Sequence, residues 1–158
     1  MIVFPDAFRA PPGADPPSDR YVFGVRPTRA AVLLVHAGGQ VRRKIERKLI
    51  RAGLSVVAVG SFDQGRWLLA DYEPDVLIAD VRLGAFNGLH LAILSHGDRP
   101  DMPVFITHPT PDLVFEREAA ACGARFVVAP ADNPDFVPDV QARAAMKAGR
   151  RVTRPTPA

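Results

Sequence analysis

Residues 75–91 have the sequence DVLIADVRLGAFNGLHL, and this stretch decides the fold. Residues 75–79 form a short run, apolar after Asp75, that is typical of a buried parallel strand, since such strands have both faces covered. A single carboxylate, Asp80, follows the run. Ligand and reaction sites in open α/β sheets lie beyond the carboxyl ends of the strands, so Asp80 is a candidate site residue. A loop-capping aspartate is the structural alternative, since turns and caps favour Asp.

The chain around this stretch alternates strand-like and helix-like segments. Five predicted strands cover residues 30–35, 55–59, 75–79, 103–107 and 125–129. The helices after them are marked by Val41, Ile45 and Leu49, by a Ser61–Gln64 capping box, by Leu89, Ile93 and Leu94 after Asn87-Gly88, by residues 111–122 and by residues 137–149. This alternation predicts a parallel sheet with helices on both faces.

Five strands favour the flavodoxin-like (βα)5 fold, a doubly wound α/β sheet with strand order 2-1-3-4-5. The first and third strands are neighbours in this order. We therefore expect His36, which follows the first strand, to lie beside Asp80, which follows the third.

The prolines and the regular patterns divide the 158-residue chain into three segments. Residues 1–29 contain six prolines and form a predicted N-terminal arm, because proline removes amide donors and disfavours helix. Residues 30–149 form the one predicted domain, and residues 150–158 a basic tail. We expect no output domain after residue 149, because nine residues are too few to form one.

Composition predicts a cytoplasmic protein without a membrane span. The single cysteine, Cys122, has no partner for an internal disulfide, which favours a reducing compartment. No apolar run approaches the roughly 18–20 residues of a transmembrane helix, and the N-terminus lacks a signal-peptide pattern.

Basic residues gather in two places although the net charge is only +3. Six cations stand against Glu46 in the first predicted helix: Arg42, Arg43, Lys44, Arg47, Lys48 and Arg51. Five more lie near the C-terminus: Arg143, Lys147, Arg150, Arg151 and Arg154. We interpret both groups as solvated helix faces. Nucleic-acid binding is the weaker alternative, because no DNA-binding motif is present and few aromatic residues accompany the cations.

With the strands placed, the chain resembles a response-regulator receiver domain of two-component signal transduction. The resemblance covers about residues 30–149 and rests on features in register: Asp80 at the phosphoacceptor position, Gly88 eight residues later, Thr107 and Phe126 at the switch positions, and Gly123-Ala124 before the fifth strand. It implies a signalling module rather than an enzyme.

The departures from the family pattern concern the phosphorylation site. His36 and Ala37 stand where the family has the acidic pair that helps to bind Mg²⁺, and Ala129 replaces the lysine before Pro130. Gly84 replaces a usual proline, and Arg82 stands where an apolar residue is common.

These departures predict a divergent receiver, or pseudo-receiver. Phosphoryl transfer to a carboxylate depends on positioning and on neutralising developing charge, and both neutralising elements are missing. We expect Asp80 not to be phosphorylated efficiently, no cofactor, and His36 or Arg82 as a cation in place of the metal. A structure with neither side chain within about 4 Å of Asp80 would contradict this replacement.

The predicted function is phosphorylation-independent protein interaction. The partner belongs to a signalling pathway, a sensor kinase or phosphotransfer protein among the candidates, and the last strand and last helix offer a face for a homodimer. The alternative is a phospho-accepting single-domain response regulator that uses Asp80 and Mg²⁺ in a phosphorelay.

Other functions have weaker support. Gly38-Gly39 at a helix start could present amides to a phosphate, but the surrounding sequence matches neither nucleotide-binding glycine motif. Ser95, His96 and His108 lack the context of a hydrolytic triad. His90 and His96 lie at i and i+6 rather than the i, i+4 of a helical zinc site, so no metal site is predicted.

Overall fold

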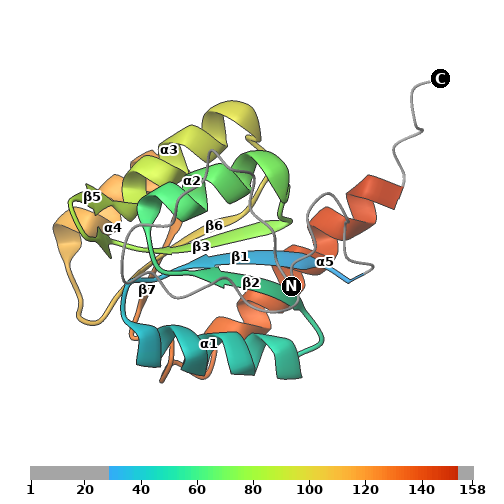
Figure 1. The fold of residues 1–158 in the computed structure, drawn as a ribbon, viewed down its shortest axis with the longest axis horizontal. Coiled ribbons are helices and arrows are strands. Elements are labelled where there is room, and N and C mark those ends of the chain that lie inside the picture. The colour runs from blue at the N-terminus through green and yellow to red at the C-terminus, as the bar shows by residue number, and fades with distance from the viewer. Residues whose placement is uncertain (1–28, 153–158) are drawn as a thin grey trace.

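The computed structural model describes residues 29–152, in which five parallel strands form one sheet (Figure 1). They are β1 (Ala31–Val35), β2 (Ser55–Val59), β3 (Val76–Asp80), β6 (Val104–His108) and β7 (Arg125–Val128). Their order across the sheet is β2-β1-β3-β6-β7. Counted over these parallel strands, this is the predicted order 2-1-3-4-5, and the flavodoxin-like fold is confirmed.

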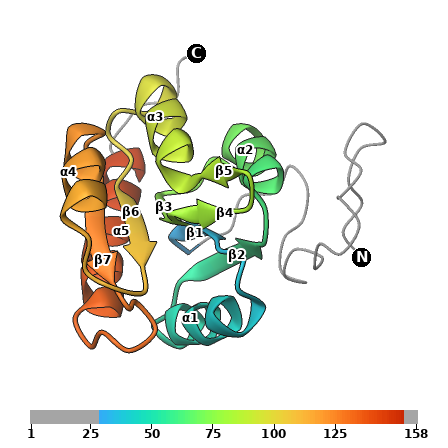
Figure 2. The same cartoon turned by 90° about the vertical axis from the view of Figure 1, so that its left-hand side faces the viewer.

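Helices cover both faces of the sheet (Figure 2). The helices α1 (Gly39–Arg51) and α5 (Phe136–Val152) lie on one face, and α2 (Phe62–Asp71), α3 (Gly88–Asp98) and α4 (Leu113–Ala121) lie on the other. Strand residues alternate between the two cores. In β1, for example, Leu33 and Val35 pack under α2 and α3, whereas Val32 and Leu34 pack under α1 and α5.

Local sequence signals fix several helix ends. The Ser61 side chain accepts a hydrogen bond from the Gln64 amide at 3.2 Å, and Oε1 of Gln64 accepts one from the Gly60 amide at 3.2 Å. This is the predicted start of α2. Asp112 caps α4 through the amides of the next turn. Gly53, beyond the end of α1, has a φ of 87°, which glycine adopts without steric cost.

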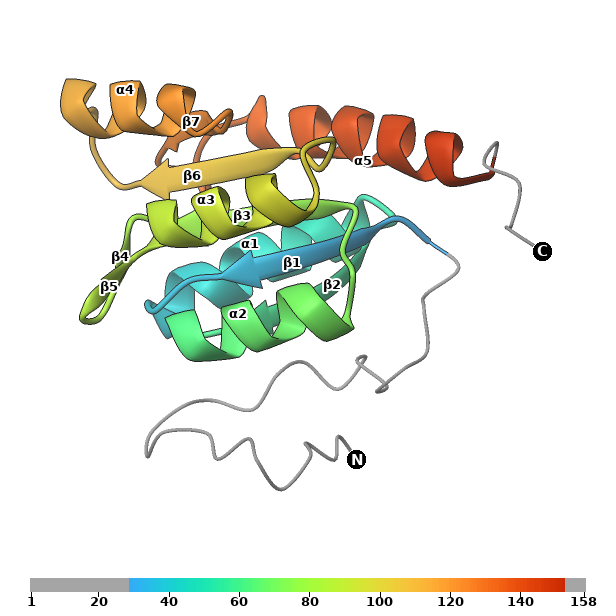
Figure 3. The same ribbon diagram turned by 90° about the horizontal axis from the view of Figure 1, so that it is seen from above.

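A short hairpin follows β3 where the sequence predicted only a loop (Figure 3). Its strands are β4 (Arg82–Leu83) and β5 (Phe86–Asn87), joined by a turn in which Gly84 has a φ of 68°. The Phe86 ring stacks on Phe62 of α2, with centroids 4.7 Å apart and planes 19° apart. This contact between distant residues explains why local sequence patterns gave no signal of the hairpin.

The apolar face predicted for α3 was right for Leu89, which is buried, and wrong for Ile93 and Leu94. Those two are 55% and 43% exposed, and Gly88, Leu91, Ala92 and Ser95 face the core instead. These four have helical spacing of their own. Gly88 packs against the end of β3, so the close contact there sets the rotation of α3.

The predicted N-terminal arm and C-terminal tail lie largely outside the described residues. Most of the predicted arm, residues 1–28, lies outside them, as do residues 153–158 of the tail. The helix α5 continues to Val152, past the predicted end at residue 149. None of the helices in residues 29–152 combines the length and apolar character needed to cross a membrane.

Candidate functional site

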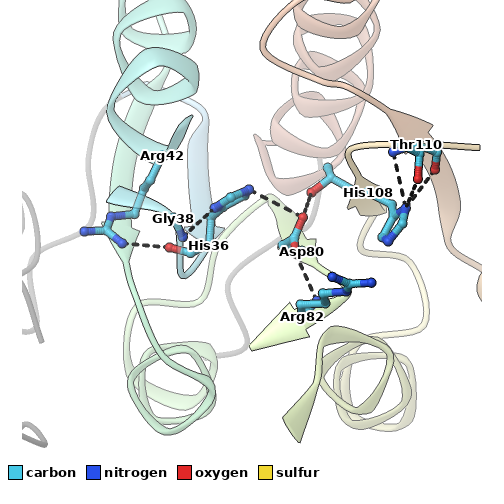
Figure 4. A network of polar contacts seen from close by, with 8 residues as sticks. His36, Gly38, Arg42, Asp80, Arg82, His108 and Thr110 are labelled. Carbon is cyan, nitrogen blue, oxygen red and sulfur yellow. Dashed lines mark hydrogen bonds and ion pairs between the residues drawn. The ribbon is translucent and has the colours of Figure 1, made fainter. Parts of the chain in front are cut away.

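Parallel pairing brings His36 and Asp80 together at the carboxyl edge of the sheet. Val35 of β1 pairs with Ala79 of β3, so the next residue of each strand lies side by side. Nε2 of His36 is 3.4 Å from Oδ2 of Asp80 (Figure 4). The adjacency expected from the strand order is therefore observed, within the 4 Å limit set for an ion pair.

Asp80 is only 6% exposed, and both carboxylate oxygens are engaged. The hydroxyl of Thr107, on the adjacent strand β6, donates to Oδ2 at 3.1 Å. The backbone amide of Arg82 donates to Oδ1 at 3.0 Å. A buried carboxylate is costly unless hydrogen bonds replace its lost hydration, and these donors supply them.

His36 is held in one tautomer. Its Nδ1 accepts a hydrogen bond from the Gly38 amide at 3.0 Å, so the proton of the neutral ring is on Nε2, facing Asp80. Burial lowers the pKa of His36 below its ordinary value, Arg42 lowers it further, and the Asp80 carboxylate opposes both. At neutral pH the lowered pKa favours the neutral imidazole beside Asp80 over the cation.

Arg42 is a residue that sequence analysis misplaced. It was assigned to a solvated basic face, yet it is 5% exposed, and its Nη1 donates to the carbonyl of His36 at 2.7 Å. A Cβ on Gly60, at the end of β2, would lie 2.9 Å from Nη1. The missing side chain at Gly60 thus makes room for the guanidinium, which Figure 4 shows on the far side of His36 from Asp80. Its spacing gave the available signal, because Arg42 falls in helical register with the buried Ile45 and Leu49, whereas Val41, predicted on that face, is 39% exposed.

The side chain of Arg82 does not pair with Asp80. Arg82 is exposed. Within residues 29–152, the only hydrogen bond between Arg82 and the Asp80 carboxylate comes from the Arg82 backbone amide. Of the two residues predicted to replace the metal, only His36 brings its side chain to Asp80.

Ala129 lies in an uncommon backbone conformation above the site, with a φ of 45°. Its amide donates to the carbonyl of His108 at 2.8 Å. A cavity of about 340 Å³ opens here, and Asp80 is one of its lining residues. The full lining is His36, Val41, Asp80, Arg82, Pro109, Ala129, Pro130, Ala131 and Asp132. Asp132 is bound at its rim by Lys44 at 2.6 Å.

Comparisons with known proteins identify the fold that carries this site. No protein-family model and no curated protein sequence matches the chain. Solved structures do match: a CheY-like response regulator receiver domain from Methanospirillum hungatei has a TM-score of 0.71 and 15% identity over 78% of this chain and 99% of its own. The chain has the fold of a receiver domain.

Two further receiver structures agree. The signal receiver domain of an HD domain-containing protein from Pseudomonas fluorescens has a TM-score of 0.71 and 20% identity, covering 82% of this chain and 97% of its own. The chemotaxis response regulator CheY4 of Vibrio cholerae has a TM-score of 0.65 and 22% identity, covering 74% and 99%. At these identities the likeness concerns the receiver fold.

The resemblance to receiver domains implies Mg²⁺ beside the phosphoacceptor, and the residues here do not fit that ion. Mg²⁺ requires a near-octahedral set of oxygen ligands. Asp80 brings a carboxylate, but the imidazole of His36 borders it, and the carboxylate of Asp132 is paired with Lys44. No cluster of three or more His, Cys, Asp or Glu residues in the described part of the chain is placed to hold a metal.

A histidine that was not predicted as a site residue contacts the predicted switch residue Phe126. His108 follows Thr107 and is 5% exposed. Its ring stacks on Phe126, with centroids 6.4 Å apart and planes 26° apart, and lies 5.4 Å from the Phe115 ring. Nδ1 of His108 is 2.7 Å from the Thr110 carbonyl. Phe126 is therefore held in a partly buried aromatic cluster.

Gly88 is required by contact rather than by chain flexibility. A Cβ at this position would lie 2.1 Å from the backbone oxygen of Asp80, closer than any real contact. The Gly88 amide also donates to the Val81 carbonyl at 3.0 Å. The start of α3 thus lies directly against the residue at the phosphoacceptor position.

Proposed function

We propose that this chain is a divergent receiver domain, a pseudo-receiver, that acts by binding protein partners without phosphorylation of Asp80. One observation carries the proposal. Both oxygens of the buried Asp80 accept hydrogen bonds from neutral donors, Thr107 and the Arg82 amide, the His36 ring lies 3.4 Å from Oδ2, and Ala129 stands where the receiver pattern has a lysine.

The chemistry of phosphoryl transfer supports this function. An incoming phosphoryl group brings negative charge to a carboxylate, and a site accelerates transfer by neutralising that charge. Here His36 occupies the acidic-pair position as a neutral imidazole, and the Ala129 side chain carries no charge.

The first proposed binding surface is the exposed side of α1, next to the site. Val41 is 39% exposed there, and Arg43 and Arg47 are exposed cations beside it. An apolar side chain flanked by positive charge suits an acidic protein surface. A sensor kinase or phosphotransfer protein is the class of partner that the fold suggests for this side.

The second proposed surface is the face of β7 and α5, through which the chain would form a homodimer. Asp139 accepts from Arg125 at 2.9 Å and from Arg143 at 3.0 Å, and Met146 is 64% exposed one turn further along α5. The ion pairs of Asp139 fix the charges on this face, and the exposed Met146 lies beside them. This combination favours a specific interface.

The deciding experiment is intact mass after incubation with acetyl phosphate and excess Mg²⁺. We expect no added phosphoryl group on the natural chain. The triple variant His36→Asp, Ala37→Asp, Ala129→Lys restores the missing groups and is expected to gain one, which its Asp80→Asn derivative should lose.

A phosphoryl group on the natural chain that the Asp80→Asn variant lacks would overturn the proposal. It would favour the alternative, a phospho-accepting receiver that uses Asp80 and Mg²⁺. Unchanged thermal stability and Trp67 fluorescence on adding Mg²⁺ would support the pseudo-receiver.

A further inference from the structure

The cavity above Asp80 has the size and walls of a small-molecule site. Its volume of about 340 Å³ falls within the range of ligand pockets, roughly 300–1,000 Å³. Most of its wall is apolar: Val41, Pro109, Ala129, Pro130 and Ala131. Such pockets combine apolar walls with a few polar groups that orient the ligand, and here the buried polar group is a carboxylate.

The carboxylate of Asp80 lacks a direct countercharge in the described part of the chain. Its contacts are the Thr107 hydroxyl, the Arg82 amide and the His36 ring, whose proton sits on Nε2. Hydrogen bonds from neutral groups satisfy the lone pairs but leave the negative charge uncompensated, which is costly for a buried ion.

The cations around the cavity are held elsewhere. Lys44 is bound to Asp132 at 2.6 Å, and Lys48 donates to the Ala131 carbonyl. Arg42 donates to the His36 carbonyl on the far side of that ring. Arg82 lines the cavity, but its exposed guanidinium makes no bond to Asp80. A positive group from outside would therefore meet a carboxylate that no lysine or arginine side chain of the described residues contacts.

We propose that this cavity binds a small organic cation, an ammonium or guanidinium group on a short apolar body. The charged group lies against Asp80, where charge-assisted hydrogen bonds replace water, and the apolar body lies against Val41 and the two prolines. The small side chain of Ala129 leaves room for it. This inference is separate from the proposed function, because it concerns a non-covalent ligand and no group transfer.

The test is an NMR titration of the full-length, ¹⁵N-labelled protein with n-butylammonium chloride at constant ionic strength. We expect saturable shifts at the amides of Arg82, Ala129 and Ala131, with a dissociation constant of about 1 mM, typical of so small a ligand. n-Butanol has nearly the same shape without the charge, and butyrate has the opposite charge. Both should bind at least about tenfold more weakly, the equivalent of about 1.4 kcal/mol.

Two variants locate the site. Asp80→Asn preserves the shape of the side chain but removes its charge, and should weaken butylammonium binding at least about tenfold. Ala129→Lys places a tethered ammonium in the same space and should abolish binding, whereas Ala129→Met fills the space without charge and tests the steric effect alone. The amide spectrum of each variant reports whether it is folded.

Three results would overturn the inference: no saturable shifts in the natural chain, equal shifts with butanol and butylammonium, or undiminished binding by Asp80→Asn. None of them depends on the phosphorylation assay. A phosphorylated Asp80 would refute the proposed function and leave the titration to decide on the cation site.

Discussion

The hydroxyl of Thr107 donates to Oδ2 of Asp80 across two strands in direct register, at 3.1 Å. The same oxygen faces Nε2 of His36 from the strand on the other side. Asp80 therefore links the ends of β1, β3 and β6, the three central strands of the sheet. This arrangement gives the aspartate a structural role that does not require phosphoryl chemistry.

Replacing Thr107 with Val should destabilise the fold. Val keeps the shape of the fully buried side chain but removes the hydrogen bond to a buried carboxylate, a loss of about 1.5–3 kcal/mol. Thr107→Ser keeps the hydroxyl and loses one methyl group, about 0.8 kcal/mol. Urea unfolding measures both. A Val variant as stable as the Ser variant would show that the hydrogen bond contributes little.

Arg42→Met should cost about 1–3 kcal/mol of stability, because the His36 carbonyl loses the guanidinium that donates to it at 2.7 Å. The matched control is Arg43→Met on the same helix, where the side chain is exposed and the expected change is within about 0.5 kcal/mol. Thermal unfolding of the two variants distinguishes them. Equal losses of stability in the two variants would mean that the Arg42 side chain lies on the solvated basic face, as the sequence predicted.

Gly88→Ala should destabilise the protein by more than about 2 kcal/mol, since the added Cβ would overlap the Asp80 backbone oxygen. Gly97→Ala, in the same helix, meets no atom within 4 Å and should stabilise by about 0.5 kcal/mol through its better helix propensity. Chemical denaturation of both variants tests the pair. The prediction fails if Gly88→Ala folds with unchanged stability.

Stability should fall as the pH drops below about 6.5, the unperturbed pKa of histidine. The pKa of His36 is lowered in the folded protein, chiefly by burial, so between its folded pKa and 6.5 the unfolded chain binds more protons. The free energy of unfolding therefore decreases on acidification through that window and levels off below the folded pKa.

His36→Gln retains a donor without titrating and should flatten this part of the pH profile. Unfolding measured between about pH 7 and 5, together with the NMR titration of the His36 ring, checks the sign. A His36 pKa above 6.5 would instead mean that the Asp80 carboxylate outweighs burial and that His36 is a cation at the site.

Most of the fold could be predicted from the sequence, because its main signals are local. Apolar runs marked the five parallel strands, and the Ser61–Gln64 pair and Gly53 marked helix ends. The hairpin after β3 was missed because the Phe86–Phe62 stack holds it against another helix. The inward face of α3 was missed because apolar residues occur on both sides of that helix, so periodicity could not select one.

Only the part of the site that follows from the strand order was predicted from the sequence. Strand order alone was enough to predict that His36 lies beside Asp80, as the structure shows. The burial of Arg42 was missed because its charge suggested exposure, although its spacing matches that of Ile45 and Leu49. The room for its guanidinium beside Gly60, just after β2, was not predictable, because it depends on a contact between distant residues. The sequence also could not show that Arg82 binds Asp80 through its backbone amide and not through its guanidinium, because every residue except proline has the same backbone donor.

The contact between Gly88 and the Asp80 carbonyl has a consequence for engineering. Because α3 begins against the backbone of Asp80 and leaves no space for a single methyl group, the aspartate side chain can be exchanged without disturbing that contact, whereas the glycine cannot be exchanged without moving the helix. A designer who grafts a new group onto this edge of the sheet must keep glycine at position 88, and at position 80 must replace the acceptor that the Asp80 side chain offers to Thr107 and Arg82. The two positions are eight residues apart in the chain, yet one is constrained by the space beside its Cα and the other by its side-chain hydrogen bonds.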